Sequence, residues 1–363
     1  MMNKVGFCIA FLIGLIYAIL FIVKLLLSCI LYGKKAVASP KFRSRPKVLT
    51  KWQYGKSCFL HLQNLTMHCV ANGDPSKPLL LLLHGFPEFW FSWRHQLNSE
   101  LAKHFRVVAI DMRGYGDTDK PAGIERYRMV HLVDDVRQAI LALGYTRCHL
   151  VGHDVGGAVA WSLAAARPAM VDRLVLLNAP HPLAYHTCLR STRSQFFRAW
   201  HLFFFQLPRL PEWLVGRQDL AALADSLTGK SQGVKRGAVC NDELEAYKFM
   251  FSAPGALTGP INYFRASLRY PDDKFELEGR RRPPIGQPTL LVFGCRDRFV
   301  TETAARLSGR YCRPGRFTYR PVPGAATGCS RTARTWSTAC CWSTCCPPTA
   351  GRLRCCPNRT SRD

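Results

Sequence analysis

The sequence predicts an α/β protein whose sheet is mostly parallel and covered by helices. Short apolar runs alternate with longer segments in which apolar residues recur at helical spacing. Several of these runs end in glycine-rich turns, as strands do where they lead into the helices of such folds. The sharpest turn, residues 152–156, places a carboxylate between two glycines. A chain of 363 residues leaves room for one large domain with an insertion or for two small domains.

Six strands are expected, at residues 79–83, 107–110, 148–151, 174–177, 290–293 and 317–322. Helices are expected at residues 129–143, where apolar side chains keep helical spacing, and at 158–166. Residues 181–284 contain aromatic helical stretches, proline breaks and a helix start at Asp242 with Glu245 as its capping-box partner. This segment is predicted to be a helical insertion over the carboxyl edge of the sheet, where open α/β sheets bind ligands. The core then comprises residues 57–180 and 285–325.

The N-terminal segment, residues 1–33, is predicted to be a membrane anchor. Residues 5–23 are uninterruptedly apolar, and the apolar run resumes at 25–32 after Lys24, so the segment is long enough to span a bilayer. A signal peptide is the alternative, but the run is too long and no small-residue cleavage site follows it. The basic linker at 34–56 predicts a cytosolic domain on the membrane of the endoplasmic reticulum. The sequon Asn64-Leu65-Thr66 argues for the opposite orientation.

The charge and the cysteines are concentrated at the ends of the chain. The net charge is +26, but residues 24–56 hold nine Lys or Arg and no acid, and residues 310–363 hold ten Arg against one Asp. A basic groove through the folded body is therefore not supported, and nucleic acid is excluded as a partner. Eight of the sixteen cysteines are scattered singly before residue 312, as in a reducing compartment, and the other eight fall between Cys312 and Cys356.

The turn around Asp154 has the spacing of a nucleophile elbow. Glycines at 152 and 156 permit a tight corner between strand and helix, which lifts the central side chain to the N-terminus of that helix. A serine there makes acyl-enzymes. A carboxylate can instead displace a leaving group at an sp³ carbon and form an alkyl ester. An ordinary glycine-rich turn is the alternative for this pentapeptide alone.

The motifs that accompany the elbow are His84-Gly85-Phe86-Pro87-Glu88-Phe89-Trp90, Gly114-Tyr115-Gly116, Phe251-Ser252-Ala253-Pro254-Gly255, and Asp297 after a late strand. With them the chain resembles the α/β-hydrolase superfamily and, within it, the membrane-anchored group of epoxide hydrolases 3 and 4. The resemblance runs from about Leu79 to Ala325. It implies the α/β-hydrolase fold, with a mostly parallel sheet, a helical lid insertion and an N-terminal transmembrane helix.

The resemblance also implies a two-step reaction on a small hydrophobic epoxide of lipid or xenobiotic origin. Asp154 attacks an oxirane carbon, and a histidine oriented by Asp297 then activates water to hydrolyse the ester and release a diol. The backbone N–H groups of Phe86 and Val155 hold the oxyanion, and Trp90 lines the pocket. The resemblance implies no metal ion and no other cofactor.

The lid departs from the family pattern. The family's two lid tyrosines donate hydrogen bonds to the epoxide oxygen. Counted from Gln206, the first of these positions is His201. The second is Phe264, with Tyr263 one place early. Val155 also stands where the family usually has tryptophan. A separate expectation is that Asp111 and Arg113 stabilise a turn as a pair.

The expected catalytic histidine is absent, because no histidine occurs between residues 298 and 363. When residues 326–338 are back-translated with permitted codons and read from the third nucleotide, they become H-W-L-Q-Q-D-R-P-D-L-V-N. This reading supplies a histidine and the start of an amphipathic helix close to where the family expects them. We therefore predict a frameshift at about Ala325-Ala326, in the gene, the transcript or the gene model, and an aberrant, unstructured tail over 326–363.

Two further functional hypotheses stay open. A haloalkane dehalogenase shares the aspartate elbow but normally uses the indole after the nucleophile to bind halide, which Val155 cannot do. A catalytically inactive protein of the same fold would bind lipid-like molecules or partners without chemistry. As written, the chain lacks its general base, so an ester at Asp154 is expected to hydrolyse slowly.

Overall fold

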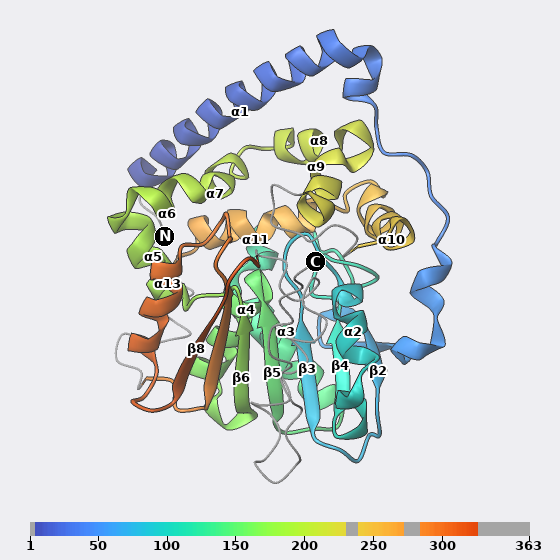
Figure 1. Ribbon diagram of the computed structural model, residues 1–363, viewed down its shortest axis with the longest axis vertical. Helices are drawn as coiled ribbons and strands as arrows, with labels where there is room; N and C mark the ends of the chain where they lie inside the picture. Colours follow the sequence, from blue (N-terminus) through green and yellow to red (C-terminus); the bar gives the residue numbers. More distant parts are fainter. Residues whose placement is uncertain (1–3, 230–238, 272–283, 326–363) are drawn as a thin grey trace, which may run out of the picture.

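The computed structural model describes residues 4–229, 239–271 and 284–325 (Figure 1). These residues build an eight-stranded sheet with the order β1-β2-β4-β3-β5-β6-β7-β8. The strands are β1 (Lys56–Leu62), β2 (Leu65–Asn72), β3 (Leu79–Leu83), β4 (Arg106–Ile110), β5 (Cys148–His153), β6 (Val171–Leu177), β7 (Thr289–Gly294) and β8 (Phe317–Val322). The predicted tail at 326–363 lies outside the described residues.

The strands from β3 to β8 form the parallel part of the sheet. They lie where the sequence predicts strands, extended by up to three residues. Strand β3 consists of five leucines, and all five are buried. A strand that is apolar at every position belongs to a sheet covered on both faces. The sequence therefore correctly predicts a mostly parallel α/β sheet.

The hairpin formed by β1 and β2 is antiparallel and was not expected from the sequence. Strand β2 also pairs antiparallel with β4, so the hairpin extends the sheet at one edge. Only Leu60 of β1 is buried, and polar residues alternate irregularly around it. The apolar run of this strand, Cys58-Phe59-Leu60, is only three residues long, which is too short to indicate a strand in the sequence.

Four helices pack against the sheet or against one another beside it: α2 (Arg94–Leu97), α3 (Met129–Ala142), α4 (Asp154–Ala166) and α13 (Glu302–Leu307). Helix α4 contacts β5 and β6, and α3 contacts both α4 and β1. The buried side chains of α3 recur at helical spacing, as the sequence predicts: Leu132, Val133, Val136, Ala139 and Ile140. This packing fixes the position of α4, whose first residue is Asp154.

The lid is built from α5 (Pro182–Ser191), α6 (Arg193–Arg198), α7 (Trp200–Phe204), α8 (Leu210–Val215), α9 (Arg217–Thr228), α10 (Asn241–Ser252) and α11 (Thr258–Arg269). Figure 1 shows most of these helices stacked over the end of the sheet from which α5 leaves β6.

The predicted capping box at Asp242 and Glu245 is wrong. Helix α10 begins one residue earlier, with Cys240 as its N-cap and Glu243 as the reciprocal capping partner. Glu245 instead pairs with Arg43, Nε to Oε2 2.7 Å.

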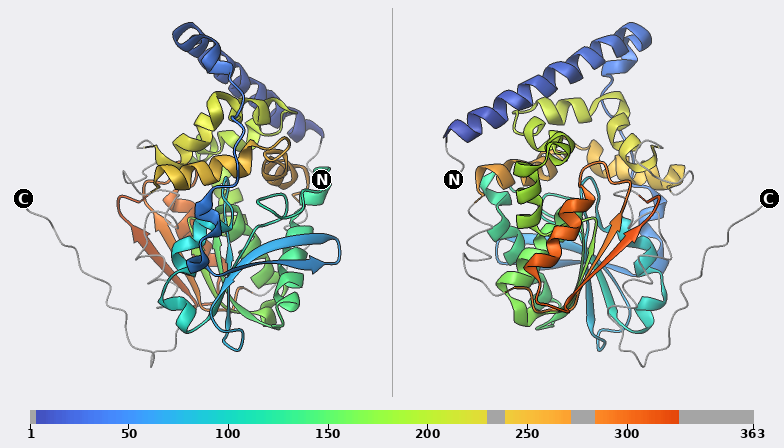
Figure 2. Two further views of the ribbon diagram at one scale, coloured as in Figure 1. Left: turned by 90° about the vertical axis from the view of Figure 1, so that its right-hand side faces the viewer. Right: turned by 60° about the vertical axis from the view of Figure 1, so that its left-hand side comes forward.

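Helix α1 (Lys4–Tyr32) lies along the outer side of the lid (Figures 1 and 2). It contains the one candidate membrane span among the described residues, Gly6–Leu31. Phe21 packs against the lid, with its ring 5.2 Å from that of Trp200 and 4.9 Å from that of Phe204. A Cβ added at Gly14 would lie 2.6 Å from the carbonyl oxygen of Phe203, so only glycine allows this close approach. The outer face exposes large apolar side chains: Ile9, Leu12, Ile16, Ile19, Leu20, Val23, Leu26, Leu27, Ile30 and Leu31.

The segment between α1 and β1, predicted as a basic linker, is tied to the folded body by its arginines. Arg43 forms ion pairs with Asp219 of α9 at 2.6 Å and with Glu245 of α10 at 2.7 Å. Arg45 pairs with Asp117 at 2.6 Å. The positive charge of this segment is therefore partly matched by acids of the lid and core.

Candidate active site

Asp154 occupies the corner between β5 and α4. Its φ of 49° lies in the left-handed region, which is uncommon for a residue with a side chain and concentrates at functional sites. A Cβ at Gly152 would lie 2.6 Å from the Cα of Gly157. One at Gly156 would collide with the carbonyl oxygen of His84. The two glycines are therefore required by the close approach of strand, turn and helix.

The turn after β3 brings a hydrogen-bond donor to this carboxylate. The backbone N–H of Phe86 donates to Oδ2 of Asp154 at 3.0 Å. A Cβ at Gly85 would lie 2.8 Å from the Cβ of Asp154, so glycine lets the turn approach this closely. Val155, the other residue predicted to supply an oxyanion donor, follows Asp154 in α4 and lines the cavity described below.

The surroundings of Asp154 raise the pKa of its carboxyl group. Burial is the largest cause, because it penalises the charged form. His153 and the N–H of Phe86 act in the opposite direction by stabilising the carboxylate. The negative charges of Glu88 and Asp297 raise the pKa further. The result is a poorly solvated carboxylate, as a nucleophile requires.

Asp297 lies in the turn after β7 and is held rigidly. Its Oδ1 accepts hydrogen bonds from the backbone N–H groups of Phe299 at 2.7 Å and Val300 at 2.8 Å. Its Oδ2 accepts from the side-chain amide of Asn178 at 2.6 Å. Asn178 follows β6, so two adjacent strand ends fix this carboxylate. Asp297 is thus held at the carboxyl edge of the sheet. It follows a late strand, β7, as the sequence predicts.

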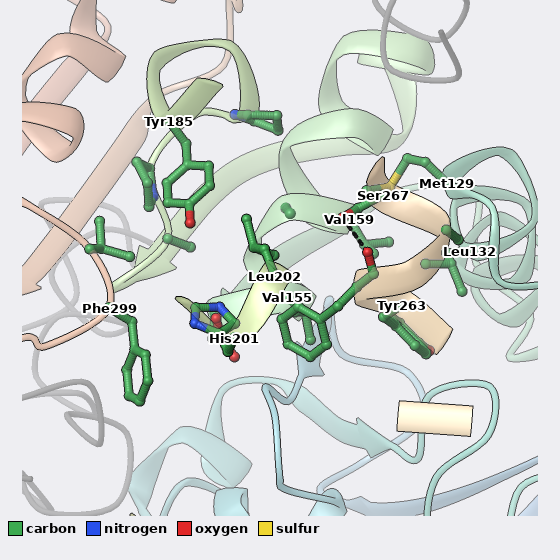
Figure 3. Close-up of a pocket in the computed structure, with 18 of the residues that line it drawn as sticks. Met129, Leu132, Val155, Val159, Tyr185, His201, Leu202, Tyr263, Ser267 and Phe299 are labelled. Atoms are coloured by element: carbon green, nitrogen blue, oxygen red, sulfur yellow. Dashed lines mark hydrogen bonds between the residues drawn. The ribbon is translucent and has the colours of Figure 1, made fainter. Parts of the chain in front are cut away.

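A cavity of about 150 Å³ lies between the sheet edge and the lid. Figure 3 shows Tyr185 and Phe299 on one side and Met129, Leu132 and Ser267 on the other. The cavity is lined mostly by apolar and aromatic groups: Tyr127, Met129, Leu132, Asp154, Val155, Ala158, Val159, Asn178, Ala179, Pro180, Pro182, Tyr185, His201, Leu202, Tyr263, Phe264, Ala266, Ser267, Tyr270, Phe299 and Val300. Such a lining fits a small hydrophobic molecule with one reactive polar group.

The three lid residues predicted to face the substrate all line this cavity, but they differ in what they offer. The rings of His201 and Phe264 meet edge to face, with centroids 5.3 Å apart. The hydroxyl of Tyr263 already donates to the backbone carbonyl of Arg113 at 2.8 Å, so it is engaged outside the cavity. The two predicted lid positions therefore present an imidazole and a phenyl ring to the cavity.

His201 is neutral at physiological pH. Burial lowers the pKa of its imidazole to about 4, and a hydrogen bond to the backbone of Arg198 offsets this only in part. Its Nδ1 is buried and has no hydrogen-bond partner among the described residues. The aromatic ring of Phe299 packs edge to face against it at 5.3 Å. A neutral imidazole has one N–H, which the backbone of Arg198 engages, so the other nitrogen is left as an acceptor, and the low pKa makes it a weak base.

Two sequence-based expectations need correction. Trp90 is not among the residues that line this cavity. Its ring packs instead against those of Tyr54, at 6.0 Å, and His68, at 6.5 Å. Asp111 and Arg113 do not pair with each other. Asp111 contacts Nδ1 of His68 at 2.8 Å and accepts from the backbone N–H of Trp90 at 2.7 Å.

The ion-pair partner of Arg113 is Asp135 of α3, at 2.6 and 2.7 Å. Both side chains are buried. The partners lie on different elements, which explains why a short-range pattern in the sequence suggested the wrong pair.

Tyr185 is one of the cavity residues that sequence reasoning missed. It lies in α5, directly after β6, and Figure 3 shows its hydroxyl directed toward the interior of the cavity. Burial raises the pKa of this phenol, and the charges of Asp154 and Asp297 raise it further. Its position after a parallel strand is the only signal in the sequence that could have indicated it.

Comparisons with known proteins agree with this geometry. Residues 78–326 match the model of the α/β hydrolase fold family. The chain is 39% identical to epoxide hydrolase 4 of Mus musculus over 272 residues, which is 74% of each protein. It is 39% identical to epoxide hydrolase 3 of Mus musculus over 291 residues, 78% of this chain and 77% of that protein.

Among solved structures, the chain resembles a variant of an epoxide hydrolase from Bacillus megaterium complexed with its diol product. The TM-score is 0.69 at 26% sequence identity, and the match covers 79% of this chain and 99% of that one. The aspartate elbow, the lid over the sheet edge and these similarities lead to one conclusion. The chain belongs to the epoxide hydrolase family of enzymes within the α/β-hydrolase fold.

Proposed function

We propose that this protein opens a small hydrophobic epoxide by attack of the Asp154 carboxylate, which forms an alkyl ester on the protein. The observation that carries the proposal is the carboxylate itself. It is held by the N–H of Phe86 at 3.0 Å and faces an apolar cavity. One carboxylate oxygen bonds to an oxirane carbon, the ring C–O bond breaks, and the ring oxygen leaves as an alkoxide that needs a proton.

The proton for that alkoxide would come from a donor in the cavity wall. Phe264 has no O–H, and the hydroxyl of Tyr263 is bound to Arg113. At the first predicted lid position the candidate is His201, whose one N–H would have to turn from the backbone of Arg198 to the alkoxide. A neutral imidazole is a weaker donor than the phenol expected there, so ring opening is expected to be slow unless the hydroxyl of Tyr185, which also points into the cavity, supplies the proton.

Hydrolysis of the ester is expected to be slower still. The eleven histidines of the chain all lie between His61 and His201. Among the described residues, His201 is the only one of them that lines the cavity. With a pKa of about 4 it is a poor general base at neutral pH. Among the described residues, no histidine of the cavity is therefore suited to be the base that Asp297 would orient, although Phe86 and Val155 would still stabilise the oxyanion.

The proposal can be tested by a single-turnover experiment in ¹⁸O water. The protein is used in excess over a styrene-type or fatty-acid epoxide. The expected result is an alkyl adduct on the peptide that contains Asp154, followed by slow entry of ¹⁸O into that carboxyl group. Asp154→Asn should abolish the adduct. The matched control is Asp134→Asn, at a partly exposed carboxylate of α3, and it should not change the formation of the adduct. Adduct formation in the Asp154→Asn variant would disprove the assignment.

A catalytically inactive binding protein is the second candidate. The apolar cavity and the replaced lid tyrosine positions favour it, because both suit binding better than chemistry. In the same experiment it predicts neither adduct nor diol, together with saturable retention of the intact epoxide. A dehalogenase is less well supported, since Val155 offers no indole N–H to a halide; release of halide from a chloroalkane would indicate it.

We infer that α1 attaches the protein to a membrane and that the catalytic domain faces the cytosol, with the endoplasmic reticulum as the predicted location. The apolar length of α1 and the basic residues that follow it support this orientation. Asn64, in the sequon, is exposed in the turn between β1 and β2. A glycan on Asn64 in the full-length protein expressed in animal cells would place the domain in the lumen instead.

A further inference from the structure

The edge hairpin carries two cysteines that face each other directly. Cys58 of β1 is the register partner of Cys69 of β2. Their Sγ atoms are 3.0 Å apart, about 1 Å more than the bond length of a disulfide. Directly opposed residues are the closest side-chain neighbours across an antiparallel pair. A disulfide here would therefore join two strands that already hold its ends together.

The two thiols differ in ways that suit thiol–disulfide exchange. Cys58 is partly exposed on the outer strand, whereas Cys69 is buried. The hydrogen bond with Cys69 lowers the pKa of Cys58, and the charges of His68, Arg106 and Lys56 lower it further, while burial opposes them. Hydrogen bonding to Cys58 and burial raise the pKa of Cys69. Because the thiolate is the nucleophile in exchange, Cys58 is the thiol that reacts first.

We propose that Cys58 and Cys69 form a reversible cross-strand disulfide by exchange with an external disulfide such as glutathione disulfide. The Cys58 thiolate attacks one external sulfur, the external S–S bond breaks, and one glutathione thiolate leaves. That thiolate takes the proton of Cys69, whose sulfur then attacks the Cys58 sulfur and expels the second glutathione. The two protein thiols lose two electrons, and the external disulfide gains them as two thiols.

This disulfide would secure the edge of the sheet. Strand β1 is the outermost strand and pairs with β2. The ring of His68, next to Cys69, bridges Ser57 of β1 and Asp111 after β4, at 2.8 Å each. A covalent link beside this bridge would hold β1 when it frays, and sheet edges are where strands separate or mispair. The inference does not depend on the proposed epoxide chemistry.

Peptide mapping of the full-length protein in detergent tests the proposal. The stretch from Ser57 to Arg94 has one internal basic residue, Lys77, which is followed by proline, so trypsin releases 57–94 with Cys58 and Cys69 as its only cysteines. After incubation with glutathione disulfide and quenching with an alkylating reagent, we expect this peptide to have lost two hydrogens and to carry no alkyl group. Dithiothreitol should restore both alkylation sites. Alkylation of both thiols after oxidation would overturn the proposal.

Single substitutions separate the internal disulfide from other oxidation. In Cys69→Ser, Cys58 should stop as a mixed disulfide with glutathione; in Cys58→Ser, the buried Cys69 should stay reduced. Cys240→Ser removes an exposed thiol of the lid and puts a hydroxyl, which can also cap the helix, at the N-cap position. The 57–94 peptide of this variant should oxidise as in the parent protein. A parent protein that accumulates only the mixed disulfide at Cys58 would also contradict the proposal.

Discussion

His201 and Phe264 occupy the two lid positions where the family resemblance predicts tyrosines. Both line the cavity, and their rings touch each other there. A phenyl ring cannot stabilise a developing alkoxide, whereas a phenol can donate a hydrogen bond to it. At the scale of single residues, we therefore expect the first step of the proposed reaction to depend on what these side chains can donate.

Phe264→Tyr should increase the rate of alkylation of Asp154. The added hydroxyl would extend from a ring that already lines the cavity, and a hydrogen bond gained only in the transition state accelerates the step. We expect an increase of about tenfold or more, which corresponds to ~1.4 kcal/mol in the barrier. Mass spectrometry of the adduct under single-turnover conditions measures this rate.

The matched control is Phe204→Tyr, which adds the same hydroxyl on the face of α7 that contacts Phe21 rather than the cavity. Its alkylation rate should stay within about twofold of the parent, because such a difference is worth under 1 kcal/mol in the barrier. Equal rates for Phe264→Tyr and the parent, with alkylation still dependent on Asp154, would mean that Phe264 does not face the epoxide oxygen.

The rate of alkylation should fall at acid pH with a midpoint above the ordinary pKa of an aspartate, about 3.9. Only the ionised carboxylate of Asp154 is a nucleophile, and burial raises its pKa. As the pH falls, the Asp154 carboxylate is therefore protonated, and stops acting as a nucleophile, at a higher pH than an exposed carboxylate would. The adduct rate is measured from neutral pH downward, with circular dichroism to show that the protein stays folded. A midpoint at or below the ordinary value would contradict the described burial.

At the scale of elements, α7 is shared between α1 and the cavity. Trp200 and Phe204 contact Phe21 of α1, whereas His201 and Leu202 line the cavity. Figure 2 shows α1 resting along the lid from two further directions. Displacement of α1 would expose the aromatic residues of α7 to water, which is unfavourable. The position of the N-terminal helix therefore bears on the shape of the cavity.

Gly14→Leu should loosen α7. The new side chain would meet the backbone of Phe203, which cannot move aside as a flexible side chain could. Leucine keeps α1 apolar, so attachment to detergent or membrane should persist. We expect faster amide hydrogen exchange in residues 200–204. Ile19→Ala, a change on the outer face of the same helix where Ile19 is 61% exposed, should leave that exchange unchanged. Identical exchange in both variants would show that α1 does not brace the lid.

At the scale of the whole molecule, the sheet is least covered at its two edge strands, β1 and β8. None of the six residues of β8 is buried. Strands β3 and β7, in contrast, are buried throughout. The predicted frameshift at about Ala325-Ala326 would replace a closing helix of the family just after this strand. The residues affected lie outside those the structure describes, so the frameshift stays a prediction, which sequencing the transcript across Pro323 to Cys329 would test.

Replacing the sequence after Ala325 by the shifted-frame reading should restore turnover. That reading places a histidine shortly after β8, next to the strand β7 that leads to Asp297. A general base contributes about 10²–10⁴-fold, so diol release should increase by that order. The control is the same tail with glutamine in place of its first histidine, which should alkylate but not turn over. Normal turnover of the chain as it stands would contradict the prediction.

The sequence by itself determined the parallel sheet, the elbow at Asp154 and the position of Asp297. These features are indicated by apolar runs and by the spacing of glycines. Both signals extend over only a few neighbouring residues, so they can be read from the sequence. The sequence also predicted that His201 and Phe264 belong to the cavity, which both line; that they replace the two lid tyrosines of the family stays a prediction.

Only the tertiary structure decided which of these groups meet, since such contacts join residues far apart in the chain. The hydroxyl of Tyr263 is occupied by a carbonyl 150 residues away, and Tyr185 enters the cavity from the opposite wall. Cys58 faces Cys69 because β1, whose apolar run is too short to indicate a strand, pairs with β2 in one register. A local pattern reports which face of an element is apolar, but packing alone selects the partner on that face.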